Sequence, residues 1–396
     1  MDFSIVIAEY NPFHIGHLYH LRQAKGDKPL IVVMSGPFVQ RGEFAVSDKY
    51  LRAQAAIDAG ADIVVELPAP FACSPAETFA EGAFKLIKAI DGGKTLSFGS
   101  ESASIEKIEN TAYLLSGEVA EIEQSIKKGV DSGLSYIKAR AAALKEYAKA
   151  NKIDVIDLSN RNDVLAVEYV KAAKGTDIEF APLKRAEMLK ELPYEEASFV
   201  SDSRNVLDDG YLPSKIYFPT ASDVRIMLDE FEFESVSEAT PRFASPVIDF
   251  WSDHYKPQDG LLLEALTKDL TDIFDVSEGL DRRLNKAAER AAGFDNAIEK
   301  AKTARYTDSR LKRIAVNSLL NVTKDLFREC LAAPAVFNVL AARKDKLPLL
   351  DHFNGEKFFN QTALKRSKNP IAQVTARAQD KFNIIFSGAN WQSKIS

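Results

Sequence analysis

Two histidines near the start of the chain, His14 and His17, are the side chains best suited to chemistry. They flank Gly16 in the string Asn11-Pro12-Phe13-His14-Ile15-Gly16-His17. Residues three positions apart lie on one side of a helix, so both imidazoles would point the same way. Each ring can donate an N–H to a phosphate oxygen, and a bound polyanion favours the cationic ring. The glycine would let a nucleotide come close to the backbone. The pair therefore predicts a nucleotide phosphate site.

The elements around this string would place it at the edge of a sheet. An apolar run over residues 3–8 precedes it and is typical of a buried parallel strand, and a helix over about 16–24 follows. A helix that begins after such a strand presents backbone N–H groups and a positive dipole end to an anion. We expect the two histidines to lie at that helix start.

Strands and helices alternate through the first hundred residues. Further buried strands are predicted at residues 29–34, 61–67 and 95–99, with helices at 47–59 and 75–90 between them. Crossovers this short impose parallel pairing and right-handed connections. The pattern predicts an α/β fold whose first domain is a doubly wound parallel sheet, similar to a Rossmann fold.

Three loops would meet at one crevice, because ligands of such sheets bind beyond the carboxyl ends of the strands. The loops at residues 9–17, 35–42 and 99–101 each follow a predicted strand. Residues 104–174 are rich in helix formers, and a short strand is expected at 177–181.

A second domain is expected in the C-terminal part. The acidic run at residues 229–238 and Pro241 mark the boundary, and the pattern from about 260 to 331 is again helical. We predict a nucleotide-binding domain over 1–235 and a mainly helical domain over 236–396.

The two predicted parts differ in charge. The whole chain carries −6, yet residues 280–396 hold 22 Lys and Arg against 11 Asp and Glu. Residues 1–279 are therefore strongly acidic. A basic segment on an acidic body favours a polyanionic partner, although lysine-rich helix faces exposed to solvent would produce the same count.

Composition excludes several classes of protein. Cys73 and Cys330 lie far apart without metal-type spacing, so a zinc site or a disulfide framework is not expected, and both are predicted to be buried. No run of about 18 apolar residues and no secretory leader are visible. We expect a soluble, cytoplasmic protein that does not contact a membrane.

The motifs resemble those of a known family. His14-Ile15-Gly16-His17 matches the H-x-G-H motif of the nucleotidylyltransferase superfamily, and the longer string from Glu9 to His20 resembles the bacterial tRNA(Met) cytidine acetate ligases. Further blocks resemble the same family in the same order. They are Met34–Glu43, Glu66-Leu67-Pro68, Phe98-Gly99-Ser100-Glu101, Asp275–Leu280 and Arg305-Tyr306-Thr307.

This resemblance implies a two-step reaction. ATP and acetate would give acetyl-adenylate and pyrophosphate, and N4 of the wobble cytidine (C34) of elongator tRNA(Met) would then take the acetyl group. Adenylation supplies a leaving group that a carboxylate lacks, and holding the reactants together can contribute ~7–11 kcal/mol. Mg²⁺ is expected to arrive with ATP, since it usually takes its ligands from phosphate and water.

The resemblance also implies which residues contact ATP. His14 and His17 would be catalytic, and Arg225 in the block Thr220–Arg225 would lie near phosphate. The full set expected to bind ATP is Ile7, Ala8, Glu9, Tyr10, Asn11, Pro12, Phe13, His14, Ile15, Gly16, His17, His20, Gly99, Asn162 and Arg185.

Basic residues elsewhere could contact the RNA. Arg41 and Lys49 lie where a loop could close over triphosphate or tRNA, and the anticodon loop would supply the splayed base. The C-terminal candidates are Arg282, Arg283, Arg310 and Arg313, with Tyr306 available to stack. Two other functions stay open from the residues: a small-molecule adenylyltransferase of the coenzyme-precursor type, and a non-catalytic RNA-binding module.

Overall fold

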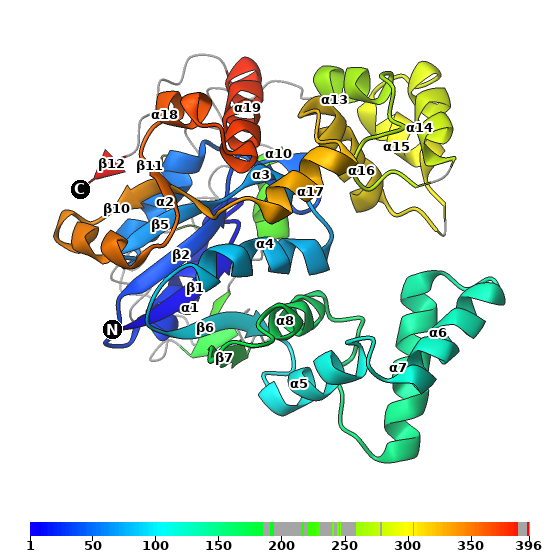
Figure 1. Ribbon diagram of the computed structural model, residues 1–396, viewed down its shortest axis with the longest axis horizontal. Helices are drawn as coiled ribbons and strands as arrows, with labels where there is room; N and C mark the ends of the chain where they lie inside the picture. Colours follow the sequence, from blue (N-terminus) through cyan, green and yellow to red (C-terminus); the bar gives the residue numbers. More distant parts are fainter. Residues whose placement is uncertain are drawn as a thin grey trace.

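A single large sheet forms the centre of the molecule, with helices on both faces (Figure 1). The computed structural model describes residues 1–184, 191–193, 215–217, 221–229, 240, 244, 246, 259–277, 279–303, 305–386 and 394–395. Arg185 and Thr220, both expected near the nucleotide, lie outside these described residues. Within them, no helix is long and apolar enough to cross a membrane.

The sheet is doubly wound about its first strand. Its order is β11-β10-β5-β2-β1-β6-β7, and β12 also pairs with β10. The strands are β1 (Asp2–Ala8), β2 (Leu30–Ser35), β5 (Ile63–Leu67), β6 (Gly93–Ser100), β7 (Glu179–Lys184), β10 (Val336–Ala342), β11 (Glu356–Phe358) and β12 (Lys394–Ile395). The chain builds outward from β1 to β2 and β5, then returns to the other side through β6 and β7, all in parallel. The switch point therefore lies between β1 and β6 of a sheet that is doubly wound, as the sequence predicted.

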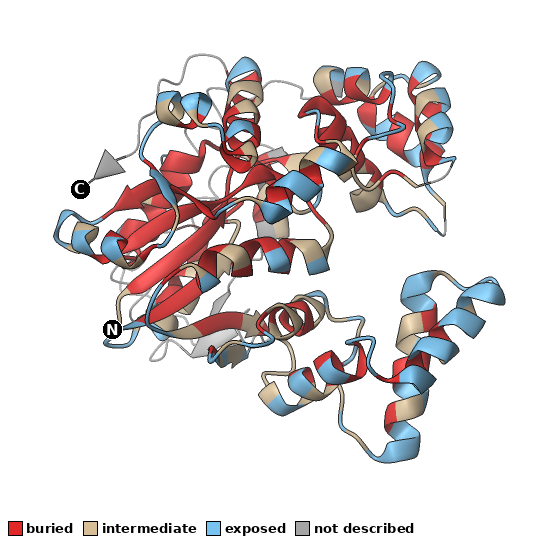
Figure 2. Cartoon of the chain, viewed as in Figure 1, coloured by how far each residue is buried: buried red, intermediate tan, exposed pale blue. Residues whose placement is uncertain are grey.

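Alternate residues of the strands face two separate cores. Ile5 and Val33 point to the side that α4 (Ala76–Lys88) and α8 (Arg161–Ala172) cover. Val6 and Val32 point to the side that α1 (Ile15–Lys25) and α2 (Lys49–Asp58) cover. A parallel strand buried on both faces is apolar throughout, which is why these runs were recognisable in the sequence (Figure 2).

A small hairpin occupies the loop predicted after the second strand. β3 (Phe38–Val39) pairs in antiparallel fashion with β4 (Glu43–Phe44). Gly42 turns this hairpin with a φ of 82°, and a Cβ there would lie 2.3 Å from the backbone nitrogen of Arg313. Only glycine permits this backbone conformation together with so close an approach to another helix.

A helical arm leaves the sheet between β6 and β7. It comprises α5 (Ile105–Leu114), α6 (Ala120–Asp131) and α7 (Tyr136–Asn151), after which α8 returns the chain to the sheet. α6 and α7 pack on each other around a hydrophobic cluster of their own, which includes Ile122, Ile126 and Leu144. In Figure 1 this hairpin extends away from the sheet.

The C-terminal part is mainly helical, as predicted. It contains α13 (Asp259–Leu266), α14 (Leu280–Glu289), α15 (Phe294–Ala301), α16 (Asp308–Leu319), α17 (Lys324–Ala332), the 3₁₀ segment η3 (Lys344–His352), α18 (Gln361–Arg366) and α19 (Pro370–Ile385). The expected boundary at 235/236 falls among residues that are not described, so it stays a prediction. The run at 336–342, however, returns to the main sheet as β10 and pairs with β5 in antiparallel fashion.

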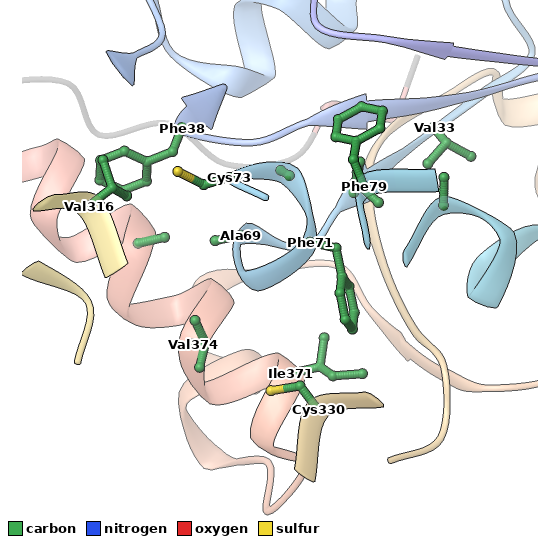
Figure 3. Packing of buried hydrophobic residues seen from close by; sticks show 14 of the residues in the cluster. Val33, Phe38, Ala69, Phe71, Cys73, Phe79, Val316, Cys330, Ile371 and Val374 are labelled. Carbon is green, nitrogen blue, oxygen red and sulfur yellow. The ribbon is translucent and has the colours of Figure 1, made fainter. Parts of the chain in front are cut away.

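The C-terminal helices share a core with the sheet. Phe71 in α3 (Ala69–Ala72) and Cys73 directly after it lie among side chains of the C-terminal helices in Figure 3. One of these side chains is Cys330 of α17. Val316 of α16 and Val374 of α19 belong to the same cluster. Both cysteines are buried, as expected, and neither forms a disulfide.

Candidate active site

The two histidines lie at the N-terminus of α1, directly beyond the carboxyl end of β1. His14 is the N-cap residue, and its backbone N–H donates to Nδ1 of His17 at 3.2 Å. The rings stack with centroids 3.7 Å apart and planes inclined by 28°. The predicted pairing of the imidazoles on one side of the helix start is thus present. Two polar rings stand beside the positive end of a helix at the topological switch point, where anions bind.

Gly16 makes room for the ring of His14. A Cβ at position 16 would lie 2.9 Å from Cε1 and 3.1 Å from Nδ1 of His14. The glycine was expected to let a nucleotide approach the backbone; the structure gives a second reason, because any larger residue would push the His14 ring away from His17.

Aromatic side chains form a wall next to His17. The ring centroid of Tyr10 lies 4.9 Å from that of His17 and 4.8 Å from that of Phe13. Both Tyr10 and Phe13 are buried. Burial raises the pKa of the Tyr10 phenol, so it is neutral at physiological pH. The wall limits the positions that the His17 imidazole can take.

The first loop is tied to the second loop and to α10 (Ala221–Asp229). The side-chain oxygen of Asn11 accepts from Val46 N–H at 2.7 Å, and its backbone carbonyl accepts from Arg225 at 2.5 Å. Arg225 also donates to Ser222 at 3.0 Å. Asn11 and Arg225, which were both expected near the nucleotide, are therefore in contact although they lie far apart in the sequence.

Glu9 adds a carboxylate to the same region. It accepts from the N–H of Gln40 at 2.8 Å. Burial raises the pKa of Glu9 above its usual range, while that hydrogen bond and the charges of Arg225, Arg41 and Arg52 act in the opposite direction. The charges of three arginines thus favour the ionised form of an acidic side chain in the loop that leads to the histidines.

Arg52 is a structural residue that sequence reasoning missed. It is fully buried in α2, and its guanidinium donates to four backbone carbonyls. They belong to Glu9 (2.7 Å), Ser35 (3.0 Å), Gly36 (2.5 Å) and Ser47 (3.2 Å). Burial lowers the pKa of Arg52 to about 10, so it stays charged at neutral pH. The apolar neighbours Leu51 and Ala53 were the only available signal that position 52 faces the interior.

Lys49 does not lie in an exposed loop, where it was expected. Its side chain is fully buried, and Nζ lies 2.8 Å from Oε2 of Glu66 at the end of β5. The same oxygen accepts from Asn338 of β10 at 2.5 Å. Burial acts to lower the pKa of Lys49, but the charge of Glu66, the hydrogen bond to it and the charges of Tyr50 and Asp48 together act more strongly, so the pKa is raised. Through its contact with Glu66, this lysine stabilises the region beneath the loop that follows β2.

The end of β6 is joined to the start of α8. Asn162 donates to Oε1 of Glu101 at 2.5 Å, and the N–H of Asp163 donates to the other oxygen at 3.1 Å. Asp163 in turn accepts from Ser100 and from the N–H of Ser102. This reciprocal capping holds Asn162 near Gly99, the last-but-one residue of β6. The two residues expected at this edge of the nucleotide site are therefore close together.

The remaining N-terminal candidates lie at two different places. His20 bonds to Ser97 of β6 at 3.0 Å, which joins α1 to the strand on the other side of the switch point. Arg41 is exposed at the tip of the small hairpin.

The C-terminal arginines differ in exposure and in contacts. Arg282 and Arg283 are both exposed, but Arg283 donates to the carbonyl of Ala301 at 2.6 Å, at the end of α15. Arg310 lies 3.2 Å from Asp275 and stacks against Tyr306, and Arg313 donates to the carbonyl of Gln40 at 3.4 Å. Three of the four expected RNA contacts thus already hold parts of the protein together.

No cluster of three or more His, Cys, Asp or Glu suited to a metal ion occurs within the described residues. The charged groups of the site are mainly donors: the two imidazoles, a helix start and the arginines around Glu9. Such a donor set fits a phosphate chain better than a bare cation.

Comparison with known proteins agrees with this geometry. The sequence matches the family described as HIGH Nucleotidyl Transferase over residues 1–394. The chain belongs to this family. The tRNA(Met) cytidine acetate ligase of Thermoanaerobacter sp. (strain X514) is 36% identical over 332 residues, which cover 82% of this chain and 79% of the relative. That of Clostridium botulinum (strain Okra / Type B1) is 29% identical over 404 residues, or 97% and 95% of the two chains.

A solved structure has the same fold over nearly the whole chain. TmcAL of Thermotoga maritima, crystallised with alpha-thio ATP, superposes with a TM-score of 0.80 at 27% identity and covers 98% of this chain and 95% of its own. The family resemblance and the fold inferred from the sequence are thereby confirmed.

Proposed function

We propose that this protein is an ATP-dependent ligase that acetylates N4 of the wobble cytidine, C34, of elongator tRNA(Met). The observation that carries the proposal is the stacked pair His14 and His17 at the start of α1, at the switch point of a sheet in this family. Relatives named tRNA(Met) cytidine acetate ligase and the ATP-analogue complex of TmcAL support it.

In the first step, an oxygen of acetate attacks the α-phosphorus of ATP. A new P–O bond forms, the bond to the β-phosphate bridge breaks, and pyrophosphate leaves with the negative charge. Catalysis of such a transfer consists mainly of alignment and charge stabilisation. The imidazoles of His14 and His17 and the N–H groups at the start of α1 are the donors for that growing charge.

In the second step, the exocyclic N4 of cytidine attacks the carbonyl carbon of acetyl-adenylate. The C–O bond to AMP breaks, and N4 loses one proton, which balances the charge on the leaving phosphate. The cytosine must leave its stack in the anticodon loop to reach the crevice. The end of β6, with Gly99, and the start of α8, with Asn162, face the switch point from the side opposite to α2. We place the nucleotide along this edge.

Mg²⁺ enters the proposal only as a companion of ATP. It requires few protein ligands and keeps several waters, which fits a site whose carboxylates, Glu9 and Glu101, already accept hydrogen bonds from the protein. Bound there, it would neutralise part of the triphosphate charge, while the protein residues bind and orient the phosphates.

The test is acetate-dependent exchange of labelled pyrophosphate into ATP, followed by mass spectrometry of nucleosides from tRNA(Met) incubated with ATP and acetate. We expect exchange without tRNA and N4-acetylcytidine only with tRNA. Exchange that depends on a different acid or a phosphorylated metabolite would instead identify a small-molecule adenylyltransferase. If the intact protein shows no exchange, the remaining alternative is a non-catalytic RNA-binding module.

A further inference from the structure

The outer face of α7 carries a row of lysines that no other part of the protein uses. Lys138, Lys145 and Lys149 are exposed, and within the described residues none of their side chains forms a hydrogen bond or an ion pair, although Lys145 attracts the carboxylate of Asp157 through space. They are 7 and 4 residues apart, so they lie within roughly 40° of one another around the helix and span about 16 Å along it. Lys152, the C-cap residue, continues the row and is also exposed.

The inner face of the same helix has the opposite character. Ala139, Ala143 and Leu144 pack into the core of the arm, and Arg140 forms an ion pair with Glu168 of α8 at 2.9 Å. The acidic residue of α7, Glu146, lies about 100° away from Lys145 and about 60° away from Lys149 around the helix. Internal contacts therefore account for the arginine of this helix but not for its lysines.

The helix dipole does not explain the row either. Cations are favourable near the C-terminus of a helix, which would account for Lys149 and Lys152. Lys138, however, lies in the first turn, where a positive charge is unfavourable. The row also belongs to residues 1–279, the part of the chain whose net charge is negative, so its positive charge differs from that of its surroundings in the sequence.

Another group of lysines in the structure is already engaged in contacts within the protein. A pocket of about 350 Å³ between α4 and α8 is lined by Lys85, Lys88, Lys171 and Lys174. Lys85 donates to the carbonyl of Leu331, Lys171 pairs with Glu168 and Glu77, and Lys174 pairs with Glu118. Carboxylates thus already neutralise two of these four lysines, and a backbone carbonyl holds a third.

The position of the arm relates the row to the active site. The arm begins directly after β6 and ends where Asn162 and Asp163 bond to Glu101. Its root is therefore at the carboxyl edge of the sheet, beside the switch point. Exposed apolar residues at its tip, Leu134, Tyr136 and Ile137, adjoin Lys138.

We propose that the outer face of α7, through Lys138, Lys145 and Lys149, binds the phosphate backbone of the tRNA whose cytidine enters the active site. The proposal rests on the proposed function for the identity of the RNA. A polyanion complements an all-lysine face, and evenly placed ammonium groups on a rigid helix match a phosphate chain without reading its sequence. Tyr136 at the end of the row is available to stack on a base or ribose.

The experiment compares two triple charge reversals in the full-length protein. The test variant is Lys138→Glu/Lys145→Glu/Lys149→Glu. The control, Lys344→Glu/Lys357→Glu/Lys368→Glu, makes the same change in net charge at exposed lysines near β11 and α18, across the sheet from the arm (Figure 1). Binding of unmodified tRNA(Met) transcript is measured by fluorescence anisotropy at several salt concentrations, and acetate-dependent pyrophosphate exchange is measured without tRNA.

We expect the α7 variant to bind tRNA at least about 10-fold more weakly than the control variant, with a salt slope smaller by about 2, as for three lost phosphate contacts. Exchange should be unchanged in both variants, and a Lys→Gln version of the α7 triple should bind with intermediate affinity. Equal tRNA affinities and salt slopes for the α7 and control variants would overturn the proposal and leave the face to a different partner. Absence of exchange in the unmodified protein would contradict the proposed function instead, because the binding comparison does not depend on it.

Discussion

The backbone N–H of His14 donates to Nδ1 of His17, while the two imidazole rings stack 3.7 Å apart. Since Nδ1 of His17 is the acceptor, a neutral His17 ring carries its proton on Nε2. The capping contact therefore fixes both the orientation and the tautomer of this ring. A helix-capping interaction and the presentation of a phosphate donor are thus the same feature of the molecule.

Replacing His17 should separate catalysis from RNA binding. We expect His17→Ala to lower acetate-dependent pyrophosphate exchange by about 10²–10³-fold, the usual loss when one donor to a developing charge is removed. The affinity for tRNA should stay within about twofold, since we expect the imidazole to contact ATP rather than the RNA. His17→Asn, whose side-chain oxygen can still cap the helix, tests whether capping alone suffices. An asparagine variant with full activity would contradict the role of the ring.

Gly16→Ala tests whether the position of the His14 ring matters. The new Cβ would approach Cε1 of His14 to 2.9 Å and displace the ring from its stack on His17. Alanine is a better helix former by about 1 kcal/mol, so the melting temperature should be unchanged or slightly higher. We expect the exchange rate to fall by about 10-fold or more despite that gain.

A matched control for this substitution is Gly260→Ala in α13, where a Cβ would meet nothing within 4 Å. That variant should keep full exchange activity. If both glycine variants were equally active, the packing of His14 against Gly16 would have no catalytic consequence.

The buried pair of Lys49 and Glu66 should behave as a structural unit. Lys49→Met leaves the Glu66 carboxylate buried without its cation and should lower the free energy of unfolding by about 3–5 kcal/mol. The double variant Lys49→Met/Glu66→Leu removes both charges and should recover much of that loss. Urea unfolding of the two single variants and the double variant gives the coupling energy. A Lys49→Met variant with normal stability but weakened ATP or tRNA binding would restore the role first expected for this lysine.

Local patterns predicted the part of the structure that positions the histidines. The strands through β6 and the helix α1 agree with the sequence prediction to within about two residues at most ends, because strands buried on both faces are apolar throughout. The same pattern predicted a doubly wound sheet and the meeting of the loops beyond its strands, whereas the switch point follows only from the observed strand order. Local sequence patterns could not predict which segments far apart in the sequence pair with each other. Nothing near position 336 indicates that this run pairs with β5 in antiparallel fashion.

Charged residues show the same limit more clearly. Lys49 and Arg52 look like ordinary solvated residues near a helix start, and only the tertiary structure reveals Glu66 and the four carbonyls as their partners. The C-terminal arginines were expected to contact RNA from their charge and spacing. Charge counts do not distinguish an arginine whose guanidinium bonds to the last turn of another helix, such as Arg283, from an equally exposed arginine without such a contact, such as Arg282.

Arg310 and Arg282 should therefore respond differently to substitution. Arg310→Ala removes the cation beside Asp275 and should lower the free energy of unfolding by about 1–3 kcal/mol. Burial raises the pKa of Asp275 above its usual range, and the charges of Arg310 and Arg313 act against this rise. Because Arg310 attracts only the ionised carboxylate, its loss should raise the folded pKa of Asp275 further, so the penalty should grow as pH rises through the folded pKa and be smallest in acid.

Arg282→Ala, at an exposed position, should change stability by less than about 0.5 kcal/mol at any pH. Thermal unfolding at pH 4, 5.5 and 7 compares the two variants. Equal and pH-independent effects would show that the contact between Arg310 and Asp275 contributes nothing.

The two cysteines offer a measure of nucleotide binding that does not depend on turnover. Cys73 and Cys330 are both fully buried, and burial raises the pKa of each thiol to about 12. Few thiolates exist at pH 8, and the folded protein shields them, so a thiol reagent should modify neither cysteine quickly and both after denaturation. Modification of the native protein then requires opening of the shared core.

ATP that binds only the folded state should slow this reaction by a factor of about 1 + [ATP]/Kd when opening is global. His17→Ala should weaken that protection, and protection by ATP that is identical in the two proteins would mean that the imidazole does not contact the bound nucleotide.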